Sequence, residues 1–263
     1  MWIELDGLAN LRDVGGIPTT DGGAIQPGQL LRSDNLQTLS PADVDALLEM
    51  RLTDVVDLRS DYEAESEGPG PLVGQPEVSI HQLSLFREWR EGVGEDKSDE
   101  RPEVLPEAAL PWVDLKPTVQ LDHPIASVYL SYLADRPDSV VEALRVISRA
   151  EGATLVHCAA GKDRTGTVVA LALSMVGADR EAVIADYAAS SERVQQIVDR
   201  LLATKTYADN LRDRPLISHM THPETMRTLL DHIDAEYGGV AGLVERLGWT
   251  AEDQQRLVAK LRG

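Results

Sequence analysis

The chain has 263 residues, which is long enough for one large α/β domain, or two small ones, with a sizeable buried core. It carries 44 acidic and 25 basic side chains, so its formal net charge is −19. This charge disfavours nucleic acid and anionic membrane surfaces as partners, because both reward clusters of Lys and Arg. A phosphorylated substrate would need a locally positive pocket that opposes the global field.

No apolar run approaches the roughly 20 residues that a helix needs to span a bilayer, so no membrane anchor is expected. Residues 1–6 lack the basic and apolar regions of a signal peptide, and we therefore expect a cytoplasmic protein. Export by an unconventional route would leave no such mark. Cys158 is the single cysteine, so an intramolecular disulfide cannot form. A lone cysteine is usually a small buried hydrophobic residue, and a chemical role has to be argued from its neighbours.

The first 60 residues predict two strands and a helix. Residues 30–33 are typical of a short strand. Ser40 and Pro41 are a favourable start for a helix that ends near Met50, because they suit the N-cap and the first helical position. Residues 53–58 are β-branched and apolar, which suits a buried strand.

The middle of the chain predicts a loop, a strand and a long insertion. Residues 66–76 contain three Pro and three Gly and predict a loop. Weak alternation over 78–85 indicates another strand. Residues 87–124 combine clustered charges with recurring prolines, and insertions of this length are often lids or binding loops. The alternative is a disordered linker, against which Trp89 and Trp112 argue because they indicate that part of the segment docks on something.

The second half predicts mainly helices. Helical periodicity is present in residues 125–134, 138–150, 165–176, 179–190, 191–203, 223–236 and 249–262. Gly177 is expected to end the third of these helices, and Thr250 to cap the last. Residues 153–157 predict a strand. There is no internal repeat and no sharp boundary, so we expect one domain over residues 1–263.

The strongest motif joins the predicted strand at 153–157 to the helix that follows. Cys158 ends the strand, five residues follow, and then comes Arg164. This spacing predicts a tight loop at a helix N-terminus, where backbone N–H groups and the helix dipole favour a phosphate dianion. Arg164 offers a planar fork to two phosphate oxygens. The residues predicted to bind the phosphate are Ala159, Ala160, Gly161, Lys162, Thr165 and Gly166.

The same N–H groups, helix dipole and Arg164 are expected to stabilise the thiolate of Cys158, which would otherwise be mostly protonated at neutral pH. The thiolate attacks phosphorus and gives a phosphocysteine that water then hydrolyses. Thr165 can donate its hydroxyl to the sulfur, which helps the sulfur to leave. His157 is expected to order the loop through its ring N–H rather than to react. The loop is not a Walker A motif, and the mechanism needs no metal and no cofactor.

Residues 157–166 resemble the HCxxGKDRTG signature of bacterial tyrosine phosphatases of the mycobacterial protein tyrosine phosphatase B type. Further matches lie at residues 10–16, 31–34, 55–60, 185–187 and 237–239. The likeness covers residues 8–63 and 125–262. It implies the cysteine-phosphatase α/β fold, with a central, mostly parallel sheet, helices on both faces, and a helical or irregular lid over 87–124.

The resemblance also assigns roles to the charged residues of the loop. In that family the Lys and Asp inside the loop are associated with activity on phosphoinositides as well as phosphoproteins. Lys162 is expected either to meet a second phosphate on an inositol ring or to offset the acidic surface. Asp163 is expected to orient water, to protonate the leaving group, or to make a structural hydrogen bond within the loop.

The general acid is not fixed by the sequence. A phenolate leaving group needs a proton donor. The resemblance places an Asp shortly after the strand at 78–85, but the segment that follows has none at the expected place. Glu88, Asp96 and Asp114 are candidates. We favour Asp163, because the loop itself fixes its distance from the site, and the predicted catalytic residues are therefore Cys158, Arg164 and Asp163.

Other charged and metal-ligating residues are assigned supporting roles. Five are predicted to form buried salt bridges that brace the loop, with a secondary phosphate contact as the alternative: Arg12, Asp13, Arg32, Asp57 and Arg59. His219 and His222 have a spacing that could begin a metal site, but no further ligand is clustered with them, so no metal is expected.

The sequence thus predicts a phosphatase acting on phosphotyrosine proteins, and also on phosphoserine, phosphothreonine or phosphoinositides. One alternative is a non-hydrolytic module that uses the same loop to recognise phosphate, against which the intact pair of Cys158 and Arg164 argues. Another is a sulfur transferase of the rhodanese kind, which also uses a Cys-headed anion loop. The Asp-Arg-Thr-Gly ending at residues 163–166 favours phosphate.

Overall fold

A mostly parallel sheet lies at the centre of the computed structural model, which describes residues 1–68, 70–86 and 117–263. Within those residues five strands pair in the order β1-β2-β5-β3-β4. They are β1 (Arg12–Asp13), β2 (Leu30–Ser33), β3 (Leu52–Asp57), β4 (Ser79–Gln82) and β5 (Ala153–His157). Only the short edge strand β1 runs antiparallel to its neighbour. The predicted α/β architecture is confirmed.

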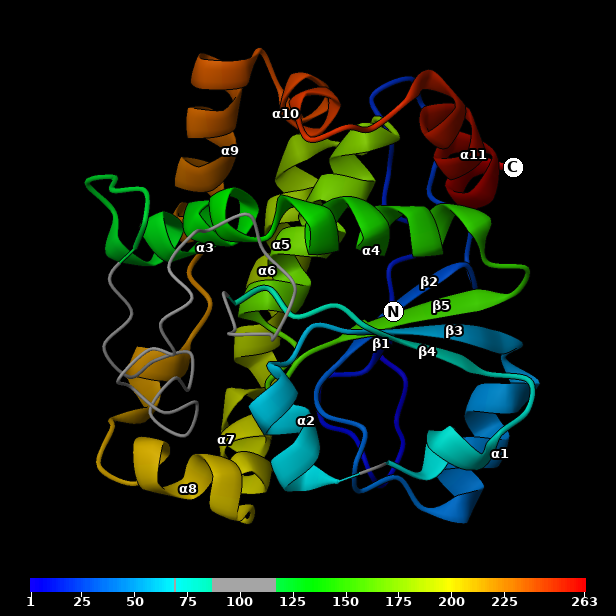
Figure 1. The fold of residues 1–263 in the computed structure, drawn as a ribbon, viewed down its shortest axis with the longest axis vertical. Helices are drawn as coiled ribbons and strands as arrows, with labels where there is room; N and C mark the ends of the chain where they lie inside the picture. The colour runs from blue at the N-terminus through cyan, green and yellow to red at the C-terminus, as the bar shows by residue number, and fades with distance from the viewer. Residues whose placement is uncertain (69, 87–116) are drawn as a thin grey trace, which may run out of the picture.

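Helices cover both faces of this sheet, as a parallel sheet requires. Figure 1 shows α1 on one face, and α4 and α5 on the other. The helices are α1 (Pro41–Glu49), α2 (Asp61–Glu67), α3 (Pro124–Asp135), α4 (Pro137–Arg149), α5 (Asp163–Met175), α6 (Arg180–Ala189), α7 (Val194–Leu202), α8 (Lys205–Leu211), α9 (Pro223–Tyr237), α10 (Val240–Arg246) and α11 (Ala251–Arg262). None of the helices described is long and apolar enough to cross a membrane.

Strand β5 and helix α5 are both held in position by burial in the hydrophobic core. Successive residues of β5 point to opposite faces, so Leu155 joins the apolar cluster under α1 while Val156 joins the larger cluster under α4 and α5. Helix α5 is apolar nearly all round, and its Val168 and Leu171 are fully buried. A helix of that kind belongs in a protein interior. The carboxyl end of β5 and the N-terminus of α5 are therefore fixed relative to each other.

Several predicted elements are confirmed. The strands at 30–33 and 153–157 have the predicted bounds. Ser40 caps α1 through a reciprocal capping box with Asp43, and Thr250 caps α11 in the same way.

Other predictions need correction. Residues 66–76 are not all loop, because α2 reaches Glu67 and a 3₁₀ helix spans Pro71–Gly74. Helix α5 begins at Asp163, two residues before the predicted start at Thr165. Helices α2, α8 and α10 were not predicted, since each has only seven residues and shows too little periodicity. Most of the predicted lid, residues 87–116, lies outside the described residues.

We expect Leu155→Ala to lower the free energy of unfolding by about 2–5 kcal/mol, because it opens a cavity in the fully buried centre of the sheet. Urea denaturation followed by circular dichroism measures the change. Leu202→Ala is the matched control, since Leu202 is 37% exposed at the end of α7, and we expect it to cost no more than about 1 kcal/mol. Equal losses in the two variants would contradict this description of the core.

Candidate active site

The loop between β5 and α5 turns sharply at Gly161. This residue has a φ of +66°, in the region that favours glycine. A Cβ atom placed there would lie 2.3 Å from the carbonyl oxygen of Ser33 on the neighbouring strand β2. Glycine is therefore required at this position for two reasons, its backbone conformation and the close approach of β2.

Three successive loop carbonyls are held by groups outside the loop. The oxygen of Ala159 accepts from the backbone N–H of Asn35 at 3.0 Å, and that of Ala160 from Asn10 Nδ2 at 2.9 Å. The oxygen of Gly161 accepts from Arg32 at 2.9 Å. Because a peptide unit is planar, anchoring its oxygen away from the cavity turns its N–H the other way. These contacts prepare the loop to receive an anion.

Arg164 is aimed by a buried carboxylate. Its two terminal nitrogens bind the two oxygens of Glu63 at 2.6 and 2.9 Å, in a fork-to-fork pair. Tyr207 donates a further hydrogen bond to Glu63 at 3.1 Å, and the Arg164 guanidinium lies 4.8 Å from the centre of the Phe86 ring. Burial is the largest single influence on Glu63 and would raise its pKa, but the charge and hydrogen bonds of Arg164, with the Ser60 N–H and Arg59, together lower that pKa. The pair is thus ionised and rigid.

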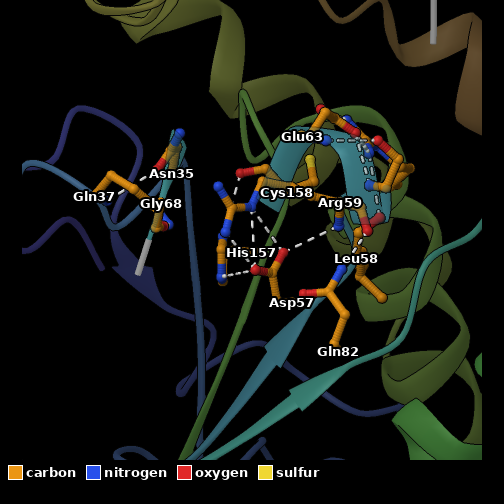
Figure 2. Close-up of polar contacts among 12 residues, drawn as sticks. Asn35, Gln37, Asp57, Leu58, Arg59, Glu63, Gly68, Gln82, His157 and Cys158 are labelled. Atoms are coloured by element: carbon orange, nitrogen blue, oxygen red, sulfur yellow. Dashed lines mark hydrogen bonds and ion pairs between the residues drawn. The ribbon is translucent and has the colours of Figure 1, made fainter. Parts of the chain in front are cut away.

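The ring of His157, which is predicted to order the loop, contacts the backbone of Cys158. The His157 Nδ1 atom lies 3.3 Å from the carbonyl oxygen of Cys158, and Nε2 lies 3.6 Å from a carboxylate oxygen of Asp57. Asp57 is held in turn by Arg59, whose Nε is 2.9 Å away. Figure 2 shows His157, Asp57 and Arg59 around Cys158. Burial lowers the pKa of His157 below its ordinary value, so the ring is neutral at neutral pH.

Most of the charged residues predicted to brace the loop do so. Asp186 binds Arg12 at 2.9 Å and Arg32 at 2.5 Å, and Arg32 also holds the Gly161 carbonyl. Burial would raise the pKa of Asp186, but the two arginines lower it. Asp13 is the exception and corrects the prediction. Its carboxylate accepts from two glycine N–H groups, at 15 and 28, both at 2.7 Å, so it organises the N-terminal turn instead of the loop.

A cavity of about 280 Å³ opens over the loop. Its base is formed by Cys158, Ala159, Ala160, Lys162, Asp163 and Arg164. Its walls are largely apolar and come from α3 and α7, through Pro124, Ile125, Val128, Val194, Ile197, Val198 and Leu201. The predicted nucleophile and the predicted phosphate clamp therefore meet at the bottom of one apolar cavity.

Three of the predicted phosphate-binding residues, Gly161, Thr165 and Gly166, are not on the lining of the cavity. Thr165 is fully buried, and its hydroxyl has no hydrogen-bond partner among the described residues. The structure therefore contains no hydrogen bond from Thr165 to the Cys158 sulfur, and the predicted donation stays a prediction. Gly166 lets helix α6 approach, because a Cβ there would lie 2.8 Å from the ring of Tyr187.

Lys162 is 9% exposed and so is not a surface charge. Its Nζ donates to the carbonyl oxygen of His219 at 2.6 Å and lies 3.5 Å from Asp163 Oδ2. His219 lines the cavity, whereas His222 lies at the start of α9. Within the described part of the chain, no group of three or more His, Cys, Asp or Glu side chains could hold a metal.

Asp163 is the first residue of α5, and its carboxylate accepts a hydrogen bond from the Tyr129 hydroxyl. Among the cavity-lining residues that the structure describes, it is the one with a carboxyl group. The other predicted proton donors, Glu88, Asp96 and Asp114, lie outside the described residues.

Sequence reasoning missed Glu63, Asn10 and Tyr129. Ser60 and Glu63 form a capping box that starts α2, and the Ser-x-x-Glu spacing was a readable signal for that helix. Nothing in this spacing indicates that the same carboxylate also holds Arg164. Asn10 and Tyr129 reach the loop through the tertiary fold alone.

A parallel sheet that delivers a cysteine, an anion-binding loop and a buried, carboxylate-aimed arginine to a helix N-terminus defines a cysteine-dependent phosphatase. The sequence pattern of the Tyrosine phosphatase family matches residues 3–263, and the chain belongs to this family. The resemblance found from the motifs is confirmed.

Two relatives show how far this likeness extends. The triple specificity protein phosphatase PtpB of Mycobacterium tuberculosis is 34% identical over 209 residues, which cover 75% of this chain and 72% of PtpB. A tyrosine-protein phosphatase of Nostoc commune is 24% identical over 258 residues, which cover 93% of this chain and 78% of the relative. The matches favour the phosphatase over the sulfur transferase.

We expect Glu63→Gln to lower kcat/KM for p-nitrophenyl phosphate by about a hundredfold, because a misaimed Arg164 no longer holds the phosphate in line with the sulfur. Steady-state kinetics at saturating and limiting substrate measure the change. Glu65→Gln on the same helix is the control, since Glu65 is exposed, and we expect wild-type rates. A fully active Glu63→Gln enzyme would show that the ion pair does not aim the clamp.

Proposed function

We propose that this protein hydrolyses phosphotyrosine in proteins through a phosphocysteine intermediate on Cys158. The observation that carries the proposal is the cavity that places Cys158 and Arg164 at its base between apolar walls. The phosphoryl group would bind the loop and Arg164, while the aromatic ring of the substrate would pack against α3 and α7. An aryl phosphate suits such walls, because burying a ring there removes apolar surface from water.

In the first step the Cys158 thiolate attacks phosphorus and the bond to the tyrosine oxygen breaks. The tyrosine leaves with that electron pair and takes up a proton. Arg164 and the loop N–H groups stabilise the charge that develops on the phosphoryl oxygens. In the second step water attacks the phosphocysteine, inorganic phosphate forms, and the sulfur leaves as a thiolate. The Thr165 hydroxyl would donate to that sulfur as it leaves.

A wider substrate range is a second part of the proposal. The relative PtpB is named a triple specificity phosphatase, which motivates testing phosphoserine and phosphothreonine. For phosphoinositides the support is Lys162, a buried cation on the cavity lining that could contact a second phosphate once it releases the His219 carbonyl. The acidic surface of the protein makes such a local cation more important.

A substrate panel tests this proposal. We expect phosphotyrosine peptides to be hydrolysed with the highest kcat/KM, and Cys158→Ser to abolish hydrolysis of every substrate, because serine is a far weaker nucleophile here. Released inorganic phosphate is measured for phosphotyrosine, phosphoserine and phosphothreonine peptides and for phosphoinositides in mixed vesicles. Wild-type rates in Cys158→Ser would refute the mechanism, and a preference for phosphoinositides over all peptides would overturn the proposed substrate.

A further inference from the structure

Four hydroxyl and carboxylate groups form a buried hydrogen-bonded chain that ends at the active site. Tyr129 on α3 donates to Asp163 Oδ1, and the hydroxyls of Tyr129 and Tyr187 lie 2.8 Å apart. Thr225 on α9 forms a hydrogen bond with the Tyr187 hydroxyl. Four helices, α3, α5, α6 and α9, thus each contribute one group, although the groups are far apart in the sequence.

The chain has a single consistent direction. Tyr129 is buried, and burial together with the nearby charge of Asp163 raises its pKa well above the ordinary value, so its hydroxyl keeps its proton. Since that proton is donated to Asp163, the hydrogen bond between the two tyrosines has to be donated by Tyr187. Thr225 then donates to Tyr187. Every donor therefore points toward the carboxylate.

This arrangement fixes the orientation of the Asp163 carboxylate on the cavity lining. Its Oδ1 accepts from Tyr129, and its Oδ2 lies 3.5 Å from the Lys162 ammonium. Asp163 also stands at the first position of α5, where the helix dipole favours negative charge. The carboxylate is thus held in one orientation on the lining of the cavity, as a group that positions a reacting water has to be.

We propose that Asp163 acts in the second step, as the base for the attacking water, and that Tyr129, backed by Tyr187, is the positioning residue that holds it. This inference rests on the proposed function and assigns the choice left open for Asp163. The water oxygen bonds to phosphorus while its proton passes to the carboxylate. The P–S bond breaks, and its electron pair returns to Cys158 as the thiolate. The proton is then released to solvent with inorganic phosphate.

Asp163→Asn separates this role from that of a leaving-group acid. With p-nitrophenyl phosphate we expect kcat to fall by about a hundredfold, while kcat/KM stays within about threefold of wild type. The reason is that kcat/KM reports the steps up to release of the phenol, and the slowed step comes after it. Stopped-flow absorbance should then show a burst of p-nitrophenol equal to the enzyme concentration.

Tyr129→Phe tests the positioning role without altering the loop. We expect a smaller effect than in Asp163→Asn: kcat falls about tenfold, kcat/KM is unchanged, and a burst of p-nitrophenol is seen. The reason is that Asp163 loses the hydrogen bond from the Tyr129 hydroxyl. Tyr187→Phe should show a weaker form of the same change. Tyr237→Phe, at the end of α9 with its ring against Arg246, is the matched control and should keep wild-type kinetics.

The outcomes separate the two proposals. A wild-type enzyme that releases no phosphate from any substrate would refute the proposed function. A wild-type enzyme with turnover, but no burst in Asp163→Asn and Tyr129→Phe, would overturn the base assignment alone. If Asp163 were the acid, kcat/KM would instead fall far more for phenyl phosphate than for p-nitrophenyl phosphate. If Tyr129 had only a structural role, kcat and kcat/KM would fall together.

Discussion

A thiolate and a phosphate dianion repel each other, and the loop from Cys158 to Arg164 has to hold both within one small cavity. The groups that offset this repulsion are backbone N–H groups, the N-terminus of α5 and one guanidinium, and the fold holds all of them in place. Arg164 cannot turn aside because both of its terminal nitrogens bind Glu63. The loop cannot relax because three of its carbonyls are anchored from outside. The surrounding fold therefore keeps the loop from Cys158 to Arg164 rigid.

The protein achieves this inside a chain of net charge −19. In the described part of the chain, buried arginines are paired with carboxylates, as in the contacts of Asp186 with both Arg12 and Arg32 and of Asp57 with Arg59. Breaking one such pair would leave an uncompensated charge in the interior, which is costly. The pair of Arg32 with Asp186 thus holds the loop carbonyl of Gly161 without leaving an unpaired arginine in the interior. Only the cavity face of the loop is left to bind an anion.

The parts of the site that are contiguous in sequence could be predicted, and the parts assembled by the fold could not. Cys158, Arg164 and the glycine turn between them share one short segment, so their spacing indicated their chemistry. Asn10 lies 150 residues from the carbonyl that it binds, and Glu63 lies 101 residues from Arg164. No local pattern reports contacts of that range. Strands β2 to β5 and the helices of nine or more residues were predicted for the same reason, since their signals are local. The two-residue strand β1 and the seven-residue helices gave too little periodicity.

Covalent trapping of the intermediate tests the central claim most directly. Wild-type enzyme would be quenched in acid during turnover of p-nitrophenyl phosphate, digested, and examined by mass spectrometry for a phosphoryl group on the peptide that contains Cys158. The account predicts a phosphoryl group on the Cys158 sulfur, and none in a sample quenched before substrate is added. Turnover with no modified Cys158 at any quench time, or with the phosphoryl group on another residue, would contradict it.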